Sequence, residues 1–445
     1  MKRVKRRALI TLCLAACMIA GLVWFCGSCA MKGRQWVGFF SGTDYYAQGS
    51  IYDRNGVLLY DAETGDYAQK SSVRKATMHL VGDSNISTSV RNVFGGDLVG
   101  YLPVIGTSLG GRDVTLTVNS ALNETALSAM GSRKGVVAVY NYKTGEILCL
   151  LSTPTYDPEN PPSDLNKSSA YEGVYLNRFF SAAYTPGSIF KIITTAAAIE
   201  NLSDWQQQTF TCTGSLPIGD DTITCPYKHG KDMDMETAFA RSCNCAYAQI
   251  ALELGGSTLE KYAKEAGLLD TGSVDGIPTA AGSFTVAEKG SGELGWSGVG
   301  QYEDLVNPCA MLRLMGGIAN EGTAVNPRLI LKENFSDTSL PGKMGKDSEE
   351  KRIWSASTCD TLKKMMRNNV QETYGQSNFG DLAVCAKSGT AEVGGNQSPH
   401  SWFVGFLDDT EHPLAFVVIV ENGGSGAKVA GSVAAKVLQA AVNTQ

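Results

Sequence analysis

The chain has 445 residues, enough for one catalytic domain together with smaller elements. Its formal net charge is −6, but residues 1–34 carry seven Lys or Arg and no acid, which leaves 31 basic against 44 acidic residues in the rest. An acidic body without a basic stripe excludes nucleic acid as its partner.

The N-terminal segment predicts a membrane anchor. Residues 8–31 contain no charge over twenty-four positions, and about twenty apolar residues span a bilayer as a helix. The sequence LAAC at 14–17 resembles a lipoprotein cleavage box, but the apolar run continues through Phe25, where a lipoprotein would turn polar. The positive-inside rule places residues 1–7 in the cytoplasm and everything after Lys32 outside, so we expect a single-pass protein of the cell membrane.

Residues 32–111 predict a small N-terminal module that is too short for a catalytic domain. Within it, residues 53–56 (Asp-Arg-Asn-Gly) lie between two short apolar runs. This pattern predicts a β-hairpin, because Asn-Gly supplies both positive-φ positions of a tight turn. The module ends at a glycine-rich stretch, 106–111.

Residues 112–445 have the pattern of one α+β domain. The expected strands are 135–140, 147–151, 382–386, 402–407 and 414–421, and the expected helices are 120–130, 189–200, 235–254, 259–266 and 355–370. A Gly- and Ser-rich stretch, 270–300, interrupts the helices. Two strands, a mainly helical insertion and three further strands predict a five-stranded, mainly antiparallel sheet covered by helices.

The first candidate catalytic motif is Ser188-x-x-Lys191. The same spacing begins at Ser72, Ser348 and Ser425, but only Ser188 follows a Pro-Gly pair and opens an apolar helix. A serine there lies among unpaired N–H groups at the positive end of the helix dipole, and Lys191 lies one turn further on. Burial lowers the pKa of a lysine, and a neutral amine can take the serine proton. The alternative is that Ser188 only caps the helix.

The second motif, Ser242-x-Asn244, occurs once in the chain. Its hydroxyl can pass a proton to a leaving group, and its amide can bind a peptide group of a substrate. A polar turn or a helix cap is the alternative interpretation.

The third motif follows an expected strand and comprises Lys387, Ser388, Gly389 and Thr390. The lysine supplies positive charge for a carboxylate, the two hydroxyls can hydrogen-bond a ligand, and the glycine allows a substrate to lie against the strand edge. The segment Lys143-Thr144-Gly145 has a sequence similar to that of the third motif, but its place between two expected strands predicts a turn.

These three motifs, in this order and 54 and 145 residues apart, resemble the motif set of penicillin-binding proteins and serine β-lactamases. Other segments narrow the resemblance to class B penicillin-binding proteins, the monofunctional peptidoglycan D,D-transpeptidases, and to the short subgroup called penicillin-binding protein A. These segments are 49–56, 144–148, 156–158, 176–178 and 401–406. Gln48 departs from the family, which usually has Arg there.

The resemblance implies an acyl-transfer mechanism on a peptidoglycan stem peptide that ends in D-Ala-D-Ala. Ser188 attacks the penultimate D-Ala carbonyl with Lys191 as general base, and Ser242, helped by Lys387, passes the proton to the departing D-Ala. An amine from a neighbouring strand then takes the acyl group and completes the cross-link.

The same resemblance implies that the backbone N–H groups of Ser188 and Thr390 form the oxyanion hole and that Ser388 and Thr390 hold the terminal carboxylate. It also implies covalent binding of β-lactams and, by analogy alone, a membrane glycan polymerase of the SEDS type as partner. The alternatives are a membrane-anchored serine β-lactamase and a β-lactam-binding receptor, for which the short cytoplasmic tail offers no signalling domain.

Four cysteines gather after the first motif: Cys212, Cys225, Cys243 and Cys245. Outside the cytoplasm a disulfide from Cys243 to Cys225 or Cys212 is possible, and reduced buried thiols are the alternative. The chain has no CxxC pair and its histidines are scattered along the sequence, at 79, 229, 400 and 412. The spacing therefore predicts no structural zinc site, and the sequence names no cofactor.

Overall fold

The computed structural model describes residues 2–41, 49–95, 98, 101–102, 107–108, 113–331, 350–395 and 397–444. Its centre is a five-stranded sheet in the order β16-β17-β18-β6-β7, with every neighbouring pair antiparallel. The strands are β6 (Gly135–Asn141), β7 (Ile147–Thr153), β16 (Val384–Ala391), β17 (His400–Leu407) and β18 (Leu414–Val420). The predicted α+β fold and its five strands are confirmed.

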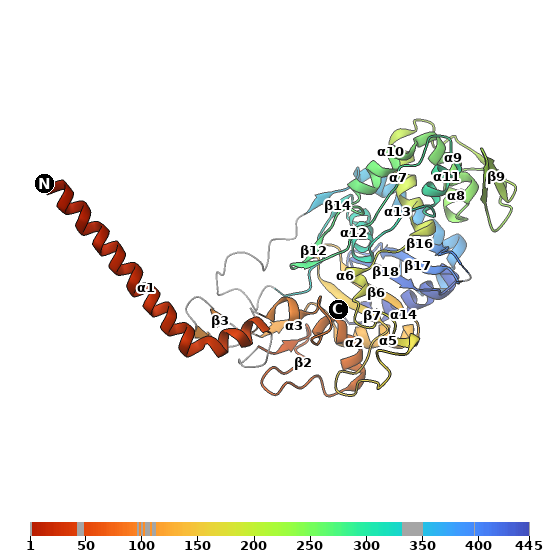
Figure 1. Ribbon diagram of the computed structural model, residues 1–445. Helices are drawn as coiled ribbons and strands as arrows, with labels where there is room; N and C mark the ends of the chain where they lie inside the picture. The colour runs from red at the N-terminus through yellow and green to blue at the C-terminus, as the bar shows by residue number, and fades with distance from the viewer. Residues whose placement is uncertain are drawn as a thin grey trace.

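Both faces of this sheet are buried. On β6, Val136 and Ala138 enter one hydrophobic core while Val137 and Val139 enter the other, because successive side chains of a strand point to opposite faces. Helices therefore cover both sides (Figure 1): α5 (Ser120–Met130) and α14 (Gly431–Val442) lie on one face, and α12 (Pro308–Ala319) lies on the other.

A helical layer beyond α12 carries two of the three motifs. Its members are α7 (Lys191–Asn201), α8 (Met235–Ala240), α9 (Asn244–Leu254), α10 (Gly256–Glu265), α11 (Gly292–Val299) and α13 (Ala356–Asn369). Two sequence predictions were wrong here. The segment 235–254 forms two helices, because Ser242 adopts a left-handed φ of 54° that no α-helix contains. The Gly-rich stretch 270–300 contains a helix, α11.

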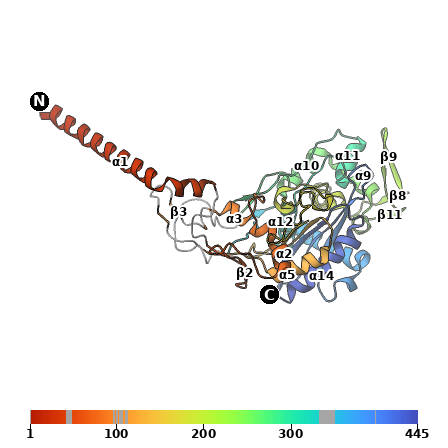
Figure 2. The same cartoon turned by 60° about the horizontal axis from the view of Figure 1, so that its bottom comes forward.

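Between α7 and α8 the chain forms an excursion of two hairpins that the sequence analysis did not predict. The outer pair is β9 (Ser215–Ile218) with β10 (Asp221–Thr224), and the inner pair is β8 (Phe210–Cys212) with β11 (Gly230–Met233). The excursion projects from the helical layer (Figure 2).

The hairpin predicted at residues 53–56 is confirmed, but its turn is not of the predicted kind. Strands β1 (Ile51–Tyr52) and β2 (Leu58–Tyr60) flank it, and β5 (Val114–Thr115) pairs in parallel with β1. Only Gly56 has a positive φ; Asn55 does not. The buried Asp53 carboxylate accepts the N–H groups of Asn55 and Val57, at 2.8 and 2.9 Å, and so fixes the turn without a second left-handed residue.

Helix α1 (Lys2–Ser41) stands away from the rest of the molecule in Figures 1 and 2. Its segment Arg3–Gly27 contains an 18-residue window with a mean hydropathy of 2.4 and is long and apolar enough to cross a membrane. Most of the glycine-rich stretch 106–111, the predicted end of the N-terminal module, lies outside the described residues.

The N-terminal region is joined to the sheet domain by buried polar contacts. Helix α2 (Ser71–Val81) packs on α5 and β7. Its Arg74 pairs with Asp157, with Nε and Oδ1 2.6 Å apart, and both side chains are at least 90% buried. Arg74 donates a second bond to Asp157 Oδ2 at 2.7 Å, so the pair is bidentate.

We predict that Asp157→Ala destabilises the protein by about 2–4 kcal/mol, because it removes the bidentate buried partner of the Arg74 guanidinium and leaves only the more exposed Glu159 paired with it. Asp360→Ala is the matched control, since it breaks an exposed pair with Lys364 and should cost under about 1 kcal/mol. Thermal unfolding of both variants checks the prediction. Equal melting temperatures for the two would show that the buried pair does not hold the N-terminal region.

Candidate active site

The segment that carries Ser188 is held from two sides. Ser188 lies in a short 3₁₀ turn, Gly187–Ile189, that leads directly into α7. Trp402 Nε1 of β17 donates to the Thr185 carbonyl at 3.0 Å, and the N–H of Gly187 donates to the Gly300 carbonyl at 2.8 Å. The position of Ser188 is therefore fixed by the sheet and by the end of α11.

Lys191 is fully buried and its amine meets four oxygen atoms. Its Nζ lies 3.0 Å from Ser188 Oγ, 2.7 Å from the Ser242 carbonyl, 2.8 Å from Asn244 Oδ1 and 3.2 Å from Ser242 Oγ. The Tyr247 ring lies 5.4 Å below it. The first two motifs thus meet at one nitrogen atom, Lys191 Nζ. The sequence analysis placed Ser188 and Lys191 one helical turn apart but did not foresee the contact with the second motif.

Burial lowers the pKa of Lys191 to about 7. Lys387 is also fully buried, and burial together with the nearby Lys191 holds its pKa well below the usual range. Within the described part of the chain, neither lysine forms an ion pair with a carboxylate. An amine at this site is therefore largely neutral at physiological pH.

Ser242 lies between the two lysines. Its Oγ is 3.2 Å from Lys191 Nζ and 3.0 Å from Lys387 Nζ. The left-handed backbone of Ser242 separates α8 from α9, which begins at Asn244. Both the oxygen and the nitrogen of the Asn244 side-chain amide form hydrogen bonds. Asn244 Oδ1 accepts from Lys191, and Nδ2 donates to the Thr224 carbonyl of the excursion at 2.8 Å. A peptide group of a substrate thus meets an amide that already has two partners.

The third motif lies on β16, at the edge of the sheet. Lys387 reaches Ser242 Oγ and is buried beneath it. Ser388 donates its backbone N–H and its hydroxyl to Tyr374 Oη, at 3.0 and 3.1 Å. The sequence analysis missed Tyr374, and the segment after α13 that carries it has no motif that signals a site.

Gly389 has a packing role that the sequence analysis did not predict. A Cβ at this position would lie 2.9 Å from the Pro186 carbonyl and 3.1 Å from Ile189 Cγ2. The missing side chain therefore lets the Ser188 segment pack against β16. This close approach of two backbones is a second reason for glycine at this position, and the expectation that a substrate lies along the strand edge here stays a prediction.

A cleft of about 680 Å³ opens over these groups. Ser188, Ser242, Asn244, Ser388 and Thr390 all line it. The Thr390 carbonyl accepts from Gln301 Nε2 at 3.4 Å, so it points away from β17 and into the cleft. The N–H of a strand residue points to the same side as its carbonyl, so the Thr390 N–H also faces the cleft. Cys225, which the sequence analysis named for a disulfide, also lines the cleft. The lining residues that sequence reasoning missed are Thr224, Pro226, Tyr227, His229, Arg241, Trp296, Val299, Gln301, Tyr302 and Glu392.

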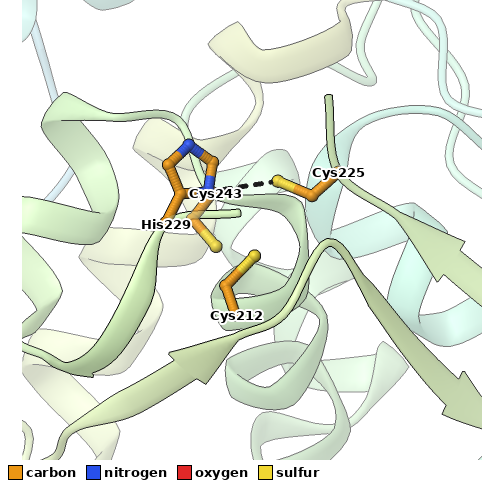
Figure 3. A group of neighbouring side chains, drawn as sticks. All are labelled: Cys212, Cys225, His229 and Cys243. Atoms are coloured by element: carbon orange, nitrogen blue, oxygen red, sulfur yellow. Dashed lines mark hydrogen bonds between the residues drawn. The ribbon is translucent and has the colours of Figure 1, made fainter. Parts of the chain in front are cut away.

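The structure brings Cys212, Cys225 and Cys243 together, as the disulfide hypothesis requires, but all three are free thiols. His229 joins them (Figure 3), with its Nδ1 3.3 Å from Cys225 Sγ. The premise that the histidines are scattered therefore does not hold for His229. Spacing could not show this, because the four residues come from three separate segments.

Comparison with known proteins identifies the class. The family model "Penicillin binding protein transpeptidase domain" matches residues 135–439, and the chain belongs to this family. Peptidoglycan D,D-transpeptidase PbpA of Mycolicibacterium smegmatis is 30% identical over 78% of this chain and 75% of its own length. PbpA of Mycobacterium tuberculosis is 26% identical over 86% of this chain and 82% of its own.

Solved structures show the same fold. Penicillin-binding protein A from M. tuberculosis, in its ceftriaxone acyl-enzyme complex, superposes with a TM-score of 0.75 at 22% identity and covers 90% of this chain and 99% of its own. A D,D-transpeptidase domain from Eggerthella lenta gives a TM-score of 0.73 at 25% identity and covers 90% of this chain and 99% of its own.

We predict that Gly389→Ala slows acylation by a fluorescent penicillin by about 10–100-fold, because the added methyl group pushes the Ser188 segment off β16. Gly95→Ala is the control, since a methyl group there meets no atom within 4 Å. Circular dichroism should show both variants folded. An unchanged acylation rate in Gly389→Ala would contradict the packing role.

Proposed function

We propose that this chain is a peptidoglycan D,D-transpeptidase that cross-links stem peptides through an acyl-enzyme on Ser188. The observation that carries the proposal is the 3.0 Å contact between Ser188 Oγ and the buried amine of Lys191. The two mycobacterial relatives carry the name peptidoglycan D,D-transpeptidase, and penicillin-binding protein A has acyl-enzyme structures with ceftriaxone, imipenem and penicillin G.

The hydrogen bonds of Lys191 favour a general base. A neutral amine has two hydrogens and one lone pair, whereas the ammonium has three hydrogens and no lone pair. Two partners of Nζ, the Ser242 carbonyl and Asn244 Oδ1, can only accept, and they lie closest. They occupy both hydrogens of the neutral amine, which leaves its lone pair for the hydroxyl proton of Ser188.

In the first half-reaction, Ser188 Oγ bonds to the penultimate D-Ala carbonyl carbon while its proton passes to Lys191 Nζ. The N–H groups of Ser188 and Thr390 hold the oxyanion, and Thr390 presents its N–H on the cleft side of β16. The C–N bond then breaks. The proton reaches the departing D-Ala nitrogen through Ser242 Oγ, which lies within hydrogen-bond distance of both lysines.

In the second half-reaction, the amine of a neighbouring strand attacks the ester carbon and gives up one proton through Ser242 Oγ to Lys191 Nζ. The ester C–O bond then breaks, and the released Ser188 Oγ takes that proton from Lys191. Ser388 and Thr390, which line the cleft on β16, hold the terminal carboxylate of the donor peptide. Asn244 contacts a substrate peptide group at the opposite wall. Each half-reaction transfers one acyl group and moves protons between the reacting groups, without oxidation or reduction. The proposed chemistry therefore requires no cofactor.

We place the reaction outside the cytoplasm. Helix α1 serves as an uncleaved anchor, with residues 1–7 cytoplasmic, residues 8–31 in the membrane, a module at 32–111 and the transpeptidase domain at 112–445. By analogy with class B enzymes, the anchor and module are the surfaces that contact a SEDS-type glycan polymerase.

The cleft favours a long-lived acyl-enzyme over β-lactam turnover. A serine β-lactamase needs a base that activates water against the ester, a role that Glu has in class A enzymes. Among the described residues that line this cleft, the one carboxylate is Glu392, and its side chain is exposed to solvent. The described lining of the cleft therefore offers no buried carboxylate for that role.

We predict that a fluorescent penicillin labels the full-length protein at Ser188 and leaves Ser188→Ala unlabelled. Ser72→Ala, which removes the serine of a second Ser-x-x-Lys sequence, should label like the wild type. Mass spectrometry of the labelled peptide checks the site. Labelled Ser188→Ala would refute the nucleophile, and rapid release of the hydrolysed drug, without D-Ala release from stem peptides, would support a β-lactamase instead.

The second-order rate constant of acylation should fall about tenfold for each pH unit below about 7 and reach a plateau above it. The direction follows from the lowered pKa of Lys191, because only the neutral amine accepts the Ser188 proton. Lys191→Arg places a guanidinium there, which stays protonated and cannot act as base, and this variant should be about 10²–10⁴-fold slower on the plateau. A wild-type rate that is constant from about pH 5 to 9 would exclude Lys191 as base.

A further inference from the structure

The thiols of Cys212, Cys225 and Cys243 and the imidazole of His229 form a compact group beside the cleft (Figure 3). The four donor atoms, three Sγ and one imidazole nitrogen, all lie within 4.8 Å of one another. They come from the end of β8, from the segment between β10 and β11, and from the N-cap of α9. Cys212 and Cys243 are buried, while Cys225 and His229 are partly exposed toward the cleft.

We propose that these four residues bind one zinc ion, which fixes the wall of the active-site cleft and positions Ser242 and Asn244. Three thiolates and one imidazole are a common ligand set of structural zinc, with Zn–S distances of about 2.3 Å and Zn–N distances of about 2.0–2.1 Å. In a tetrahedron of this size neighbouring donors lie about 3.5–3.8 Å apart. The four donor atoms therefore need to close by only about 1 Å.

The types of ligand atom also indicate which metal ion binds here and whether its role is structural or catalytic. Thiolates and imidazole select zinc over calcium or magnesium, which prefer oxygen ligands. Four protein ligands complete the tetrahedron and leave no open position for water, so the site is structural and does not compete with Ser188 for the chemistry. Disulfides, even with the neighbouring Cys245 as a fourth thiol, would leave the His229 imidazole without a role beside Cys225.

The excursion has few other means of holding its shape. Strands β8 and β11 pair at only two positions, with an irregularity between them. Besides Cys212, the buried apolar side chains of the excursion are Phe210 and Met233 at its base and Ile218 and Ile223 in the outer hairpin. Small elements with little core commonly depend on a metal or a disulfide. A zinc ion would tie two segments of this excursion to the start of α9 at a single point.

The link to the active site is covalent and short. Cys243 lies between Ser242 and Asn244, and Cys225 follows Thr224, whose carbonyl accepts from Asn244 Nδ2. Ser242 is held in a left-handed conformation, while the next residue, Cys243, donates its N–H to Ala238. A bond from zinc to Cys243 Sγ therefore holds the adjacent Ser242 in its strained conformation. The Ser242 hydroxyl is the group that lies between the two lysines.

The first test is the metal content of the full-length protein, purified in detergent with reductant and without chelator. We expect about one zinc per chain by elemental analysis. Cys212→Ser should lose most of it, and Cys359→Ser, which changes a buried thiol on α13, should keep it. Cys212 does not line the cleft, so its variant removes a ligand without altering the substrate surface.

A second measurement covers the case in which Cys212→Ser does not fold. Wild-type protein reloaded with Co²⁺ should show the thiolate charge-transfer band and the intense d–d bands of a tetrahedral centre. Zinc should also protect Cys212, Cys225 and Cys243 from a maleimide until a chelator is added. No metal uptake by the reduced wild type, equal zinc in Cys212→Ser, or a mapped disulfide within this group would overturn the site.

The positioning role has its own readout. Chelation of zinc should slow acylation by a fluorescent penicillin by about 10–100-fold, and added zinc should restore it. Unchanged acylation by the zinc-free protein would overturn the positioning role. Failure of the Ser188 assignment would leave the zinc content and the cobalt spectrum unaffected, so the two proposals fail separately.

Discussion

The site depends on one buried amine that has no carboxylate partner among the described residues. Lys191 occupies the centre of the helical layer, where a charge is costly, and its closest neighbours are two carbonyl oxygens. A lysine in such a place is stable chiefly when neutral. The same burial that makes Lys191 costly to the fold makes it able to accept a proton from Ser188.

Most of the architecture serves to hold oxygen atoms around that amine. Ser188 is fixed by Trp402 of the sheet and by Gly300, and Gly389 allows the two backbones to approach closely. Ser242 comes from a break between two helices, which requires a left-handed residue. Two of the three motifs come from the helical layer and the third from β16, and only the packing of helices on the sheet edge brings them together.

The sequence allowed the sheet and the three motifs to be predicted, because strand alternation and local motif context are short-range signals. It did not reveal Tyr374, which approaches Ser388 from a segment without a pattern of its own. The excursion was missed because its strands are short and mostly exposed. The grouping of His229 with three cysteines depends on how that excursion folds back on α9, and spacing alone carries no such information.

The most direct test of this account is a titration of Lys191 itself, by NMR of protein labelled with ¹³C at lysine Cε and assigned with Lys191→Arg. The account predicts that the Lys191 resonance titrates with a pKa of about 7, apart from the solvent-exposed lysines. A resonance that titrates with them, near the ordinary lysine value of about 10.4, would mean that the amine is charged at neutral pH and cannot be the base.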